Sequence, residues 1–201
     1  MRTIIIGLFL LQATQVVSAQ NELPFKPKFS LGTRVTYSPI KAINYMGNGL
    51  GGQIRFQPIA RLNTEWYLDY MISSTALTAK KSTYIGWSLL LYSKNNYNFS
   101  RAIQPFLSIG HCFDRTLVYE KANPNNRATR VTMATHAGAG AHFNIFPRFD
   151  ITFNAKYMVH LGKNIETLQS NDKLVIQPAI ENHFDGHLLM NLSLNYQLSR
   201  N

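Results

Sequence analysis

Apolar and polar residues alternate along most of this chain, as in β-strands whose two faces meet different surroundings. The segment 188–198 shows the pattern most clearly, because leucine, methionine and tyrosine at every second position alternate mainly with asparagine, serine and glutamine. After residue 11, no stretch of the chain approaches the run of about 20 apolar residues that a transmembrane helix needs. A transmembrane strand needs only about 9–11 residues. The alternation predicts eight strands, at residues 29–38, 50–58, 65–72, 83–92, 103–113, 131–145, 149–161 and 188–198.

Short and long connections alternate between these strands. The connections at 59–64 and 146–148 are short, and the one at 93–102 is moderate. The remaining connections are longer, at 39–49, 73–82, 114–130 and 162–187. Outer-membrane barrels have an even number of antiparallel strands, short periplasmic turns and longer extracellular loops. The pattern therefore predicts an all-β fold, an eight-stranded antiparallel up-and-down transmembrane β-barrel.

The charges on the less apolar face separate a membrane barrel from a soluble one. A soluble periplasmic lipocalin-like binding barrel would turn its apolar face inward and its charges outward. Here the apolar face has almost no lysine or glutamate, and the other face carries sparse charges of both signs among small polar residues. We predict that these charges pair inside a lumen filled by side chains, which gives a porin-like wall without a wide channel. The predicted lumen charge network is Arg34, Arg55, Glu65, Asp69 and Lys156, with Asp150 on the same face.

The N-terminus has the organisation of a secretory signal peptide. Arg2 precedes an apolar run at 4–11, and small residues follow at Val17-Ser18-Ala19. The run is too short for a transmembrane helix, and the small residues match a signal-peptidase site. We therefore expect cleavage after Ala19, with residues 1–19 as signal peptide and 20–201 as one outer-membrane β-barrel domain.

Composition adds a constraint on stability and on partners. Cys112 is the single cysteine, so no internal disulfide can form, whereas a closed barrel gives every backbone group a partner. The formal net charge is +10. Because an exported chain rarely meets nucleic acid, we expect outer-membrane lipid and lipopolysaccharide as anionic partners and no nucleic acid. A merely soluble basic surface is the alternative explanation of the charge.

The long connections are the candidates for binding a partner, since loops on a rigid scaffold often carry function. The connection 114–130 contains four cations and favours an anionic partner, and an extracellular protein or glycan is the other possibility. A bare structural role is the alternative, and we expect a monomer. The loop candidates for an anionic partner are Arg115, Lys121, Arg127 and Arg130.

Catalytic and metal chemistry finds little support in the sequence. His136 and His142 lie on one face but about 20 Å apart by strand rise, too far to share a metal. His187, with Glu181, His183 and Asp185 nearby, could form a loop metal site, although solvated histidines are the simpler explanation. We therefore predict no metal, no cofactor and no catalytic residues.

A lipid A-modifying barrel enzyme, a deacylase or acyltransferase, is the alternative to a structural protein. Such an enzyme would need serine, histidine and acid on one face near the outer rim. Ser108 and His111 have opposite parity on their predicted strand, so the sequence does not show such a set.

Three segments carry a family resemblance: PFLSIG at 105–110, GAGAHFNIFP at 138–147 and GHLLMNLSLNY at 186–196. With them, the chain resembles the small outer-membrane β-barrel proteins common in Bacteroidetes-type Gram-negative bacteria, over nearly the whole mature length. The resemblance implies location and architecture. It leaves activity open, because fold alone does not determine function.

Overall fold

The computed structural model describes residues 25–39, 47–93, 102–170, 173–182 and 185–198. The predicted signal peptide and most of the connections 39–49 and 93–102 lie outside these residues. The described residues contain no helix that is long and apolar enough to cross a membrane. They form ten strands: β1 (Lys28–Ser38), β2 (Gly47–Ile59), β3 (Leu62–Ser74), β4 (Thr78–Tyr92), β5 (Ile103–Glu120), β6 (Arg127–Phe146), β7 (Phe149–Leu161), β8 (Lys163–Ser170), β9 (Lys173–Asn182) and β10 (Asp185–Gln197).

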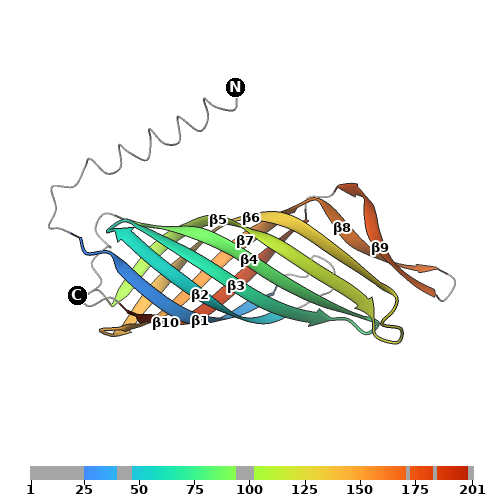
Figure 1. Ribbon diagram of the computed structural model, residues 1–201, viewed down its shortest axis with the longest axis horizontal. Coiled ribbons are helices and arrows are strands. Elements are labelled where there is room, and N and C mark those ends of the chain that lie inside the picture. Colours follow the sequence, from blue (N-terminus) through green and yellow to red (C-terminus); the bar gives the residue numbers. More distant parts are fainter. Residues whose placement is uncertain (1–24, 40–46, 94–101, 171–172, 183–184, 199–201) are drawn as a thin grey trace, which may run out of the picture.

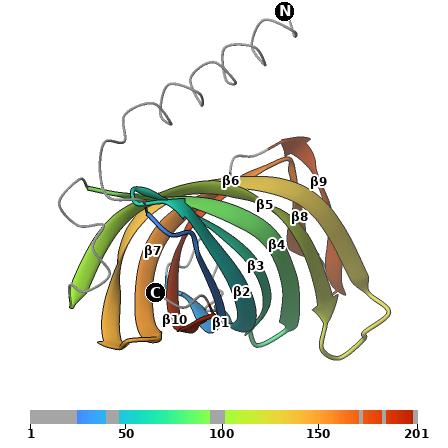
Figure 2. The ribbon, with the colours of Figure 1, turned by 60° about the vertical axis from the view of Figure 1, so that its left-hand side comes forward.

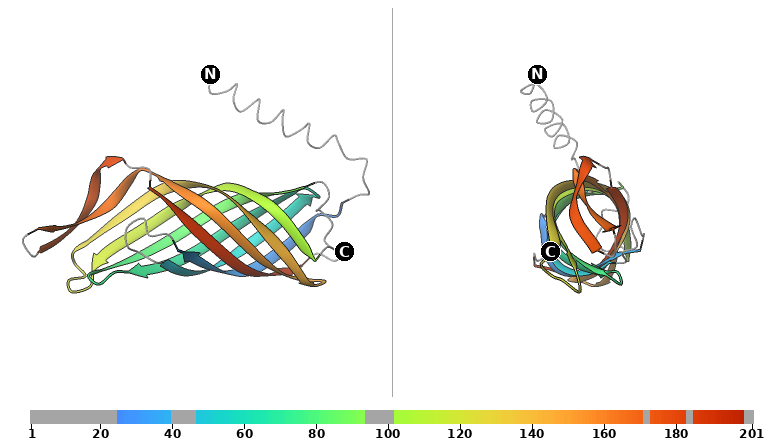
Figure 3. Two further views of the ribbon diagram at one scale, coloured as in Figure 1. Left: turned by 180° about the vertical axis from the view of Figure 1, so that it is seen from behind. Right: turned by 90° about the vertical axis from the view of Figure 1, so that its right-hand side faces the viewer.

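Eight of these strands close into a barrel in the order β1-β10-β7-β6-β5-β4-β3-β2, with every neighbouring pair antiparallel. Seen along its axis, the wall is a closed ring (Figure 3). β1 and β10 complete it, with Ser30 opposite Gln197, and they lie side by side in Figure 2. The predicted eight-stranded antiparallel barrel is confirmed.

The two ends of the barrel differ. We call the end with the β2–β3 and β6–β7 turns, where β1 begins and β10 ends, the turn end. The opposite end, which we call the hairpin end, carries the β5–β6 turn and a separate two-stranded sheet of β8 and β9. This small sheet projects beyond the barrel (Figure 1).

The predicted long loop at 114–130 is wrong, because β5 continues to Glu120 and β6 resumes at Arg127. Inward-facing Asp114, Thr116 and Val118 extend the alternation of β5 beyond the apolar belt, the band of the wall whose outward side chains are apolar. The hydrophobic pattern does not predict this extension, since a strand beyond the belt no longer needs an apolar outer face. The connection 73–82 is also shorter than predicted, with a turn only at 75–77.

The predicted loop at 162–187 is largely the β8–β9 hairpin. Gly162, with φ of 137°, allows the chain to leave β7 and turn into β8, a conformation that other residues rarely adopt. The hairpin packs on the inward side of the β5–β6 extension, where Val118, Ile165 and Ile176 form an apolar cluster. Asn126 Nδ2 also donates to the Leu174 carbonyl oxygen at 2.6 Å. This end of the barrel is therefore a two-layered ridge.

The outer wall is apolar and the interior is polar, in the phase that the alternation predicts. Leu50, Leu107 and Val131 are exposed by 70%, 63% and 71%, and Trp66 pairs with Trp87 on the same face. The 11 residues of β1 rise by about 3.3 Å each, so at a tilt of about 40° they span roughly 28 Å. That height matches an apolar band of about 25 Å in outer-membrane barrels.

Two glycines on the inner face of β6 let it pack closely against its neighbours. A Cβ at Gly138 would overlap the Ala155 carbonyl oxygen and lie 2.6 Å from Lys156 Cα. A Cβ at Gly140 would lie 2.5 Å from the ring of Phe106, which pairs with Gly140 across the sheet. The glycine-rich composition of this segment thus follows from the tight curvature of the wall.

Candidate functional site: the barrel interior

The interior holds buried ionic and hydrogen-bonded groups at three levels along the barrel axis. The level nearest the turn end is built on an ion pair between Arg55 of β2 and Asp150 of β7, both almost fully buried. Thr152 donates to Asp150 at 2.7 Å, and Asn195 Nδ2 donates to it at 2.9 Å. Paired with Arg55 and satisfied by these donors, the carboxylate forms a structural cross-link between β2 and β7 across the interior.

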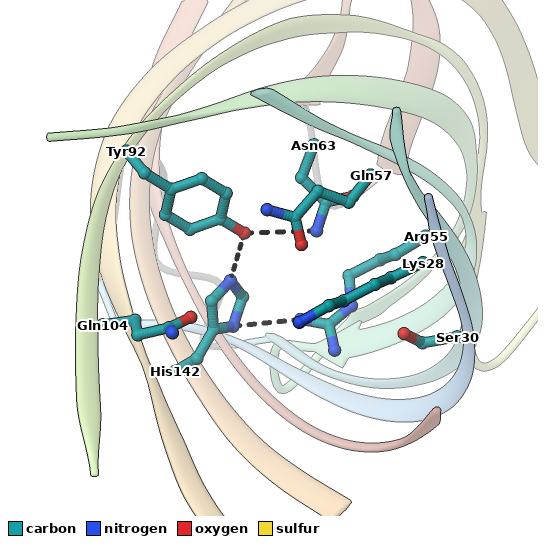
Figure 4. A pocket seen from close by; sticks show the side chains of 8 residues that line it. All are labelled: Lys28, Ser30, Arg55, Gln57, Asn63, Tyr92, Gln104 and His142. Carbon is teal, nitrogen blue, oxygen red and sulfur yellow. Dashed lines mark hydrogen bonds between the residues drawn. The ribbon is translucent and has the colours of Figure 1, made fainter. Parts of the chain in front are cut away.

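A small cavity adjoins this pair, and Figure 4 shows the side chains around it. Its volume is about 10 Å³, which is room for about one water molecule and excludes a larger ligand. The lining residues are Lys28, Ser30, Arg55, Gln57, Asn63, Tyr92, Gln104 and His142.

Tyr92 and His142 are joined by a buried hydrogen bond whose direction depends on the histidine tautomer. His142 Nε2 lies 2.8 Å from the Tyr92 hydroxyl oxygen, to which Asn63 Nδ2 donates at 3.1 Å. His142 Nδ1 lies 2.6 Å from Thr152 Oγ1 and 2.9 Å from Arg55 Nη1. Because this group is buried beside a cavity with room for about one water molecule, it packs the interior and is closed to a substrate.

Replacing Tyr92 with phenylalanine tests this structural role. The change leaves two buried polar groups, the Asn63 amide and the His142 ring, without their partner at the Tyr92 hydroxyl, so we expect the free energy of unfolding to fall by about 1–3 kcal/mol. Urea unfolding of the refolded protein in lipid vesicles would measure it. Tyr70→Phe, on the exposed outer wall, is the matched control and should change little. A Tyr92→Phe variant as stable as the wild type would contradict the assignment.

The middle level is organised around the ring of Tyr67. Arg34 pairs with Glu65 at 3.1 Å and with Asp69 at 3.0 Å. The guanidinium carbon of Arg34 lies 4.5 Å from the Tyr67 ring centroid, and Lys156 Nζ lies 4.1 Å from it. Two cations and two carboxylates thus meet around one aromatic ring, and their charges sum to zero.

The structure therefore divides the predicted lumen charges between two levels. It brings four of them together around Tyr67, whereas Arg55 pairs with Asp150 nearer the turn end. Sequence analysis missed the central role of Tyr67, because an inward tyrosine has the same signature as ordinary core packing. Period-two parity gives the face of each residue but not which residues share a level.

The level nearest the hairpin end centres on Asp114 of β5. It pairs with Arg130 at 2.8 Å and with His160 Nδ1 at 3.2 Å, and Thr116 donates to it at 2.7 Å. The His160 ring stacks on that of His187, with centroids 5.0 Å apart. The prediction that Arg130 is a loop residue is wrong, because β6 extends through it and its side chain points inward. Its Nη1 also donates to Asn164 Oδ1 at 2.7 Å, which ties β8 to the barrel.

The other three loop candidates lie where a partner can reach them. Arg115 and Arg127 are exposed on the outer face of β5 and β6. Lys121 is exposed in the β5–β6 turn, and its Nζ donates to the Thr75 carbonyl oxygen at 2.6 Å.

The described residues do not assemble a nucleophile, base and acid at the hairpin end. His160 and Asp114 pair there, but no serine hydroxyl among these residues hydrogen-bonds His160. Ser108 is buried in the interior, while His111 lies on the outer wall, where Trp87 Nε1 donates to it at 3.2 Å. Ser88 meets His136 at 3.0 Å, but both are enclosed within the barrel.

Metal ligands are likewise not gathered in the part of the chain that the structure describes. Within it, no three histidine, cysteine, aspartate or glutamate residues are placed to share an ion. The side chains of Glu181, His183 and Asp185, from the possible loop site, lie outside the described residues.

Comparison with known proteins identifies the architecture. No family model and no curated protein matches the chain. Among solved structures, Neisserial surface protein A aligns with 85% of this chain and 96% of its own, at a TM-score of 0.59 and 10% identity. A major outer membrane protein of Thermus thermophilus aligns with 87% of this chain and 100% of its own, at 0.59 and 8%. AlkL, solved in DMPC lipid bilayers, aligns with 90% and 97%, at 0.50 and 10%.

The fold is that of a small outer-membrane β-barrel. At these identities the likeness concerns the fold alone. The comparison therefore supports the barrel architecture, and the description of the ion pairs inside it rests on the structure of this chain.

Proposed function

We propose that the chain is an integral outer-membrane protein with a packed lumen and a structural or surface-interaction role. The observation that carries this proposal is the inversion of the two faces: exposed leucine, valine and aromatic side chains outside, and paired charges inside. A lipocalin-like barrel has the opposite arrangement. The turn end then faces the periplasm and the hairpin end faces outward.

The β5–β6 extension and the β8–β9 hairpin are the proposed partner-binding region. The β8–β9 hairpin projects beyond the barrel (Figure 1), and an extracellular protein or glycan is the kind of partner such a ridge would meet. We propose that the protein works as a monomer, without cofactor, and that residues 1–19 direct its export. Membership in the Bacteroidetes-type family of small barrels belongs to the same proposal, and the sequence resemblance supports it. The lipid A-modifying enzyme remains the alternative, and it would need serine, histidine and acid together at the outer rim, a set that the described residues do not assemble.

Tryptophan fluorescence gives a direct test of membrane insertion. The chain has two tryptophans, Trp66 and Trp87, and both lie on the outer wall. We expect phospholipids brominated on their acyl chains to quench this emission strongly in vesicles, because the indoles contact the chains. A shift in gel mobility between unboiled and boiled samples should accompany the quenching, since a closed barrel resists detergent.

Fractionation of cells that express the full chain tests location and export. We expect the mature protein, without residues 1–19, in the outer membrane. Recovery as a soluble periplasmic protein with unquenched tryptophans would overturn the proposal in favour of a soluble binding barrel.

A further inference from the structure

Three cations lie in a diagonal row on the outer wall at the hairpin end, about 13 Å long by strand rise between the levels of Arg115 and Arg127. Lys81 of β4, Arg115 of β5 and Arg127 of β6 all share the outward face of their strands. Lys81 pairs with Leu117 across the sheet, so Arg115, two residues away, is its diagonal neighbour at about 7–8 Å. We call these three residues the basic strip.

Tyr119 connects the strip across the three strands. Lys81 Nζ lies 5.4 Å from the centroid of the Tyr119 ring, and Tyr119 is directly opposite Arg127. Arg115 and Arg127 are exposed, and Lys81 is half-buried. Lys81 and Arg127 therefore flank the Tyr119 ring on the outer face, and Arg115 continues the row toward the turn end.

Among the residues whose side chains the structure describes, no carboxylate shares the outward face of the strip. Four of the acidic side chains that the structure describes point into the barrel, and each is paired with an arginine there: Glu65, Asp69, Asp114 and Asp150. Glu120 is next to Tyr119 but on the opposite, inward face of β5, where Asn126 donates to it at 2.7 Å, and Glu166 lies in the β8–β9 hairpin. The outer wall at this level is thus positively charged in the described part of the chain.

An apolar surface lies below the strip. Moving toward the turn end, Arg115 is followed on its face by Phe113. Thr83 separates Lys81 from Ile85, and Thr129 separates Arg127 from Val131. Ile85, Phe113 and Val131 are exposed by 58%, 52% and 71%. A row of cations above an exposed apolar wall is complementary to a lipid with an anionic headgroup above its acyl chains.

We infer that the basic strip binds the phosphate groups of lipid A, the lipid portion of lipopolysaccharide, while the acyl chains lie along the apolar wall below. This inference rests on the proposed outer-membrane function, and it names a lipid partner for the outer wall at the hairpin end. Arginine and lysine form strong charge-assisted hydrogen bonds to phosphate. The apolar wall favours a lipid over free phosphate, which would gain nothing from it.

Calorimetric titration of the refolded full chain tests this site. The protein would be held in neutral maltoside micelles and titrated with bis-phosphorylated lipid A. We expect the triple variant Lys81→Gln/Arg115→Gln/Arg127→Gln to bind at least tenfold more weakly than the wild type. The matched control is Lys26→Gln/Arg61→Gln/Arg148→Gln, which removes the same residue types from exposed positions at the turn end and should bind as the wild type does.

Equal binding by the strip variant, or equal weakening by the control, would overturn the site. Displacement of lipid A by millimolar inorganic phosphate would show a free-phosphate site and overturn the lipid assignment. Brominated-lipid quenching of the same samples separates the two proposals. If the wild type inserts but the strip variant keeps full affinity, only the lipid A site fails, whereas a wild type that does not insert removes the proposed function itself.

Discussion

Replacing Asp150 with alanine is expected to destabilise the barrel by about 3–5 kcal/mol, because it leaves a buried guanidinium without its counter-charge. Arg55 and Asp150 are almost fully buried, and the same carboxylate accepts from Thr152 and Asn195. Urea unfolding in lipid vesicles, followed by the emission of Trp66 and Trp87, would measure the loss. The outward position of both indoles makes their emission sensitive to departure from the lipid.

A double variant separates the loss of the pair from the presence of an unpaired charge. Arg55→Met/Asp150→Leu removes both charges and keeps much of the volume, so it should recover most of the lost stability. Glu166→Ala, in the β8–β9 hairpin, is the control for removing a carboxylate elsewhere and should change stability by less than about 0.5 kcal/mol. If the free energy of unfolding of Asp150→Ala were within about 1 kcal/mol of the wild-type value, the Arg55–Asp150 pair would not hold the barrel together.

Replacing Gly138 with valine is expected to prevent closure of the barrel. The new Cβ would overlap backbone atoms of Ala155 and Lys156 on β7, so relief requires separating two paired strands. Overpacking against movable side chains usually costs about 1–3 kcal/mol, and a clash with backbone should exceed that range. The fraction that migrates as the compact form on an unboiled gel would report the result.

Ala139→Val is the matched control for this substitution. It adds a valine to the next residue of the same strand, but Ala139 points outward and is exposed. We expect this variant to fold with the yield of the wild type. Equal folding of both variants would mean that β6 and β7 can separate at Gly138 without loss of the barrel.

The sequence predicts the wall of this protein much better than its contents. A period of two is a local signal, so the strand 149–161 and the outward face of segments such as 188–198 follow from a few residues each. The partner of an inward residue depends on strand tilt and stagger, which are properties of the closed barrel. Arg55 and Asp150 are 95 positions apart, and no local pattern connects them.

The hairpin end is the hardest part to predict, for a different physical reason. Above the apolar belt both faces of a strand can be polar, so the alternation fades although the hydrogen-bonded ladder continues. In the sequence Arg130 looks like a loop residue, because its positive charge resembles that of Arg127, which is exposed. Its partner Asp114 lies 16 residues back along the chain, on the other arm of the same extension.

The two-layered ridge of β5–β6 and β8–β9 also determines how this end of the molecule would meet proteases and antibodies. Backbone that is hydrogen-bonded in a sheet does not enter a protease cleft readily, so cleavage within the β5–β6 layer should concentrate at the exposed 121–125 tip. An antibody against the ridge would recognise a preformed shape and lose little conformational entropy on binding. Heat-denatured protein should therefore raise antibodies that recognise the intact surface poorly.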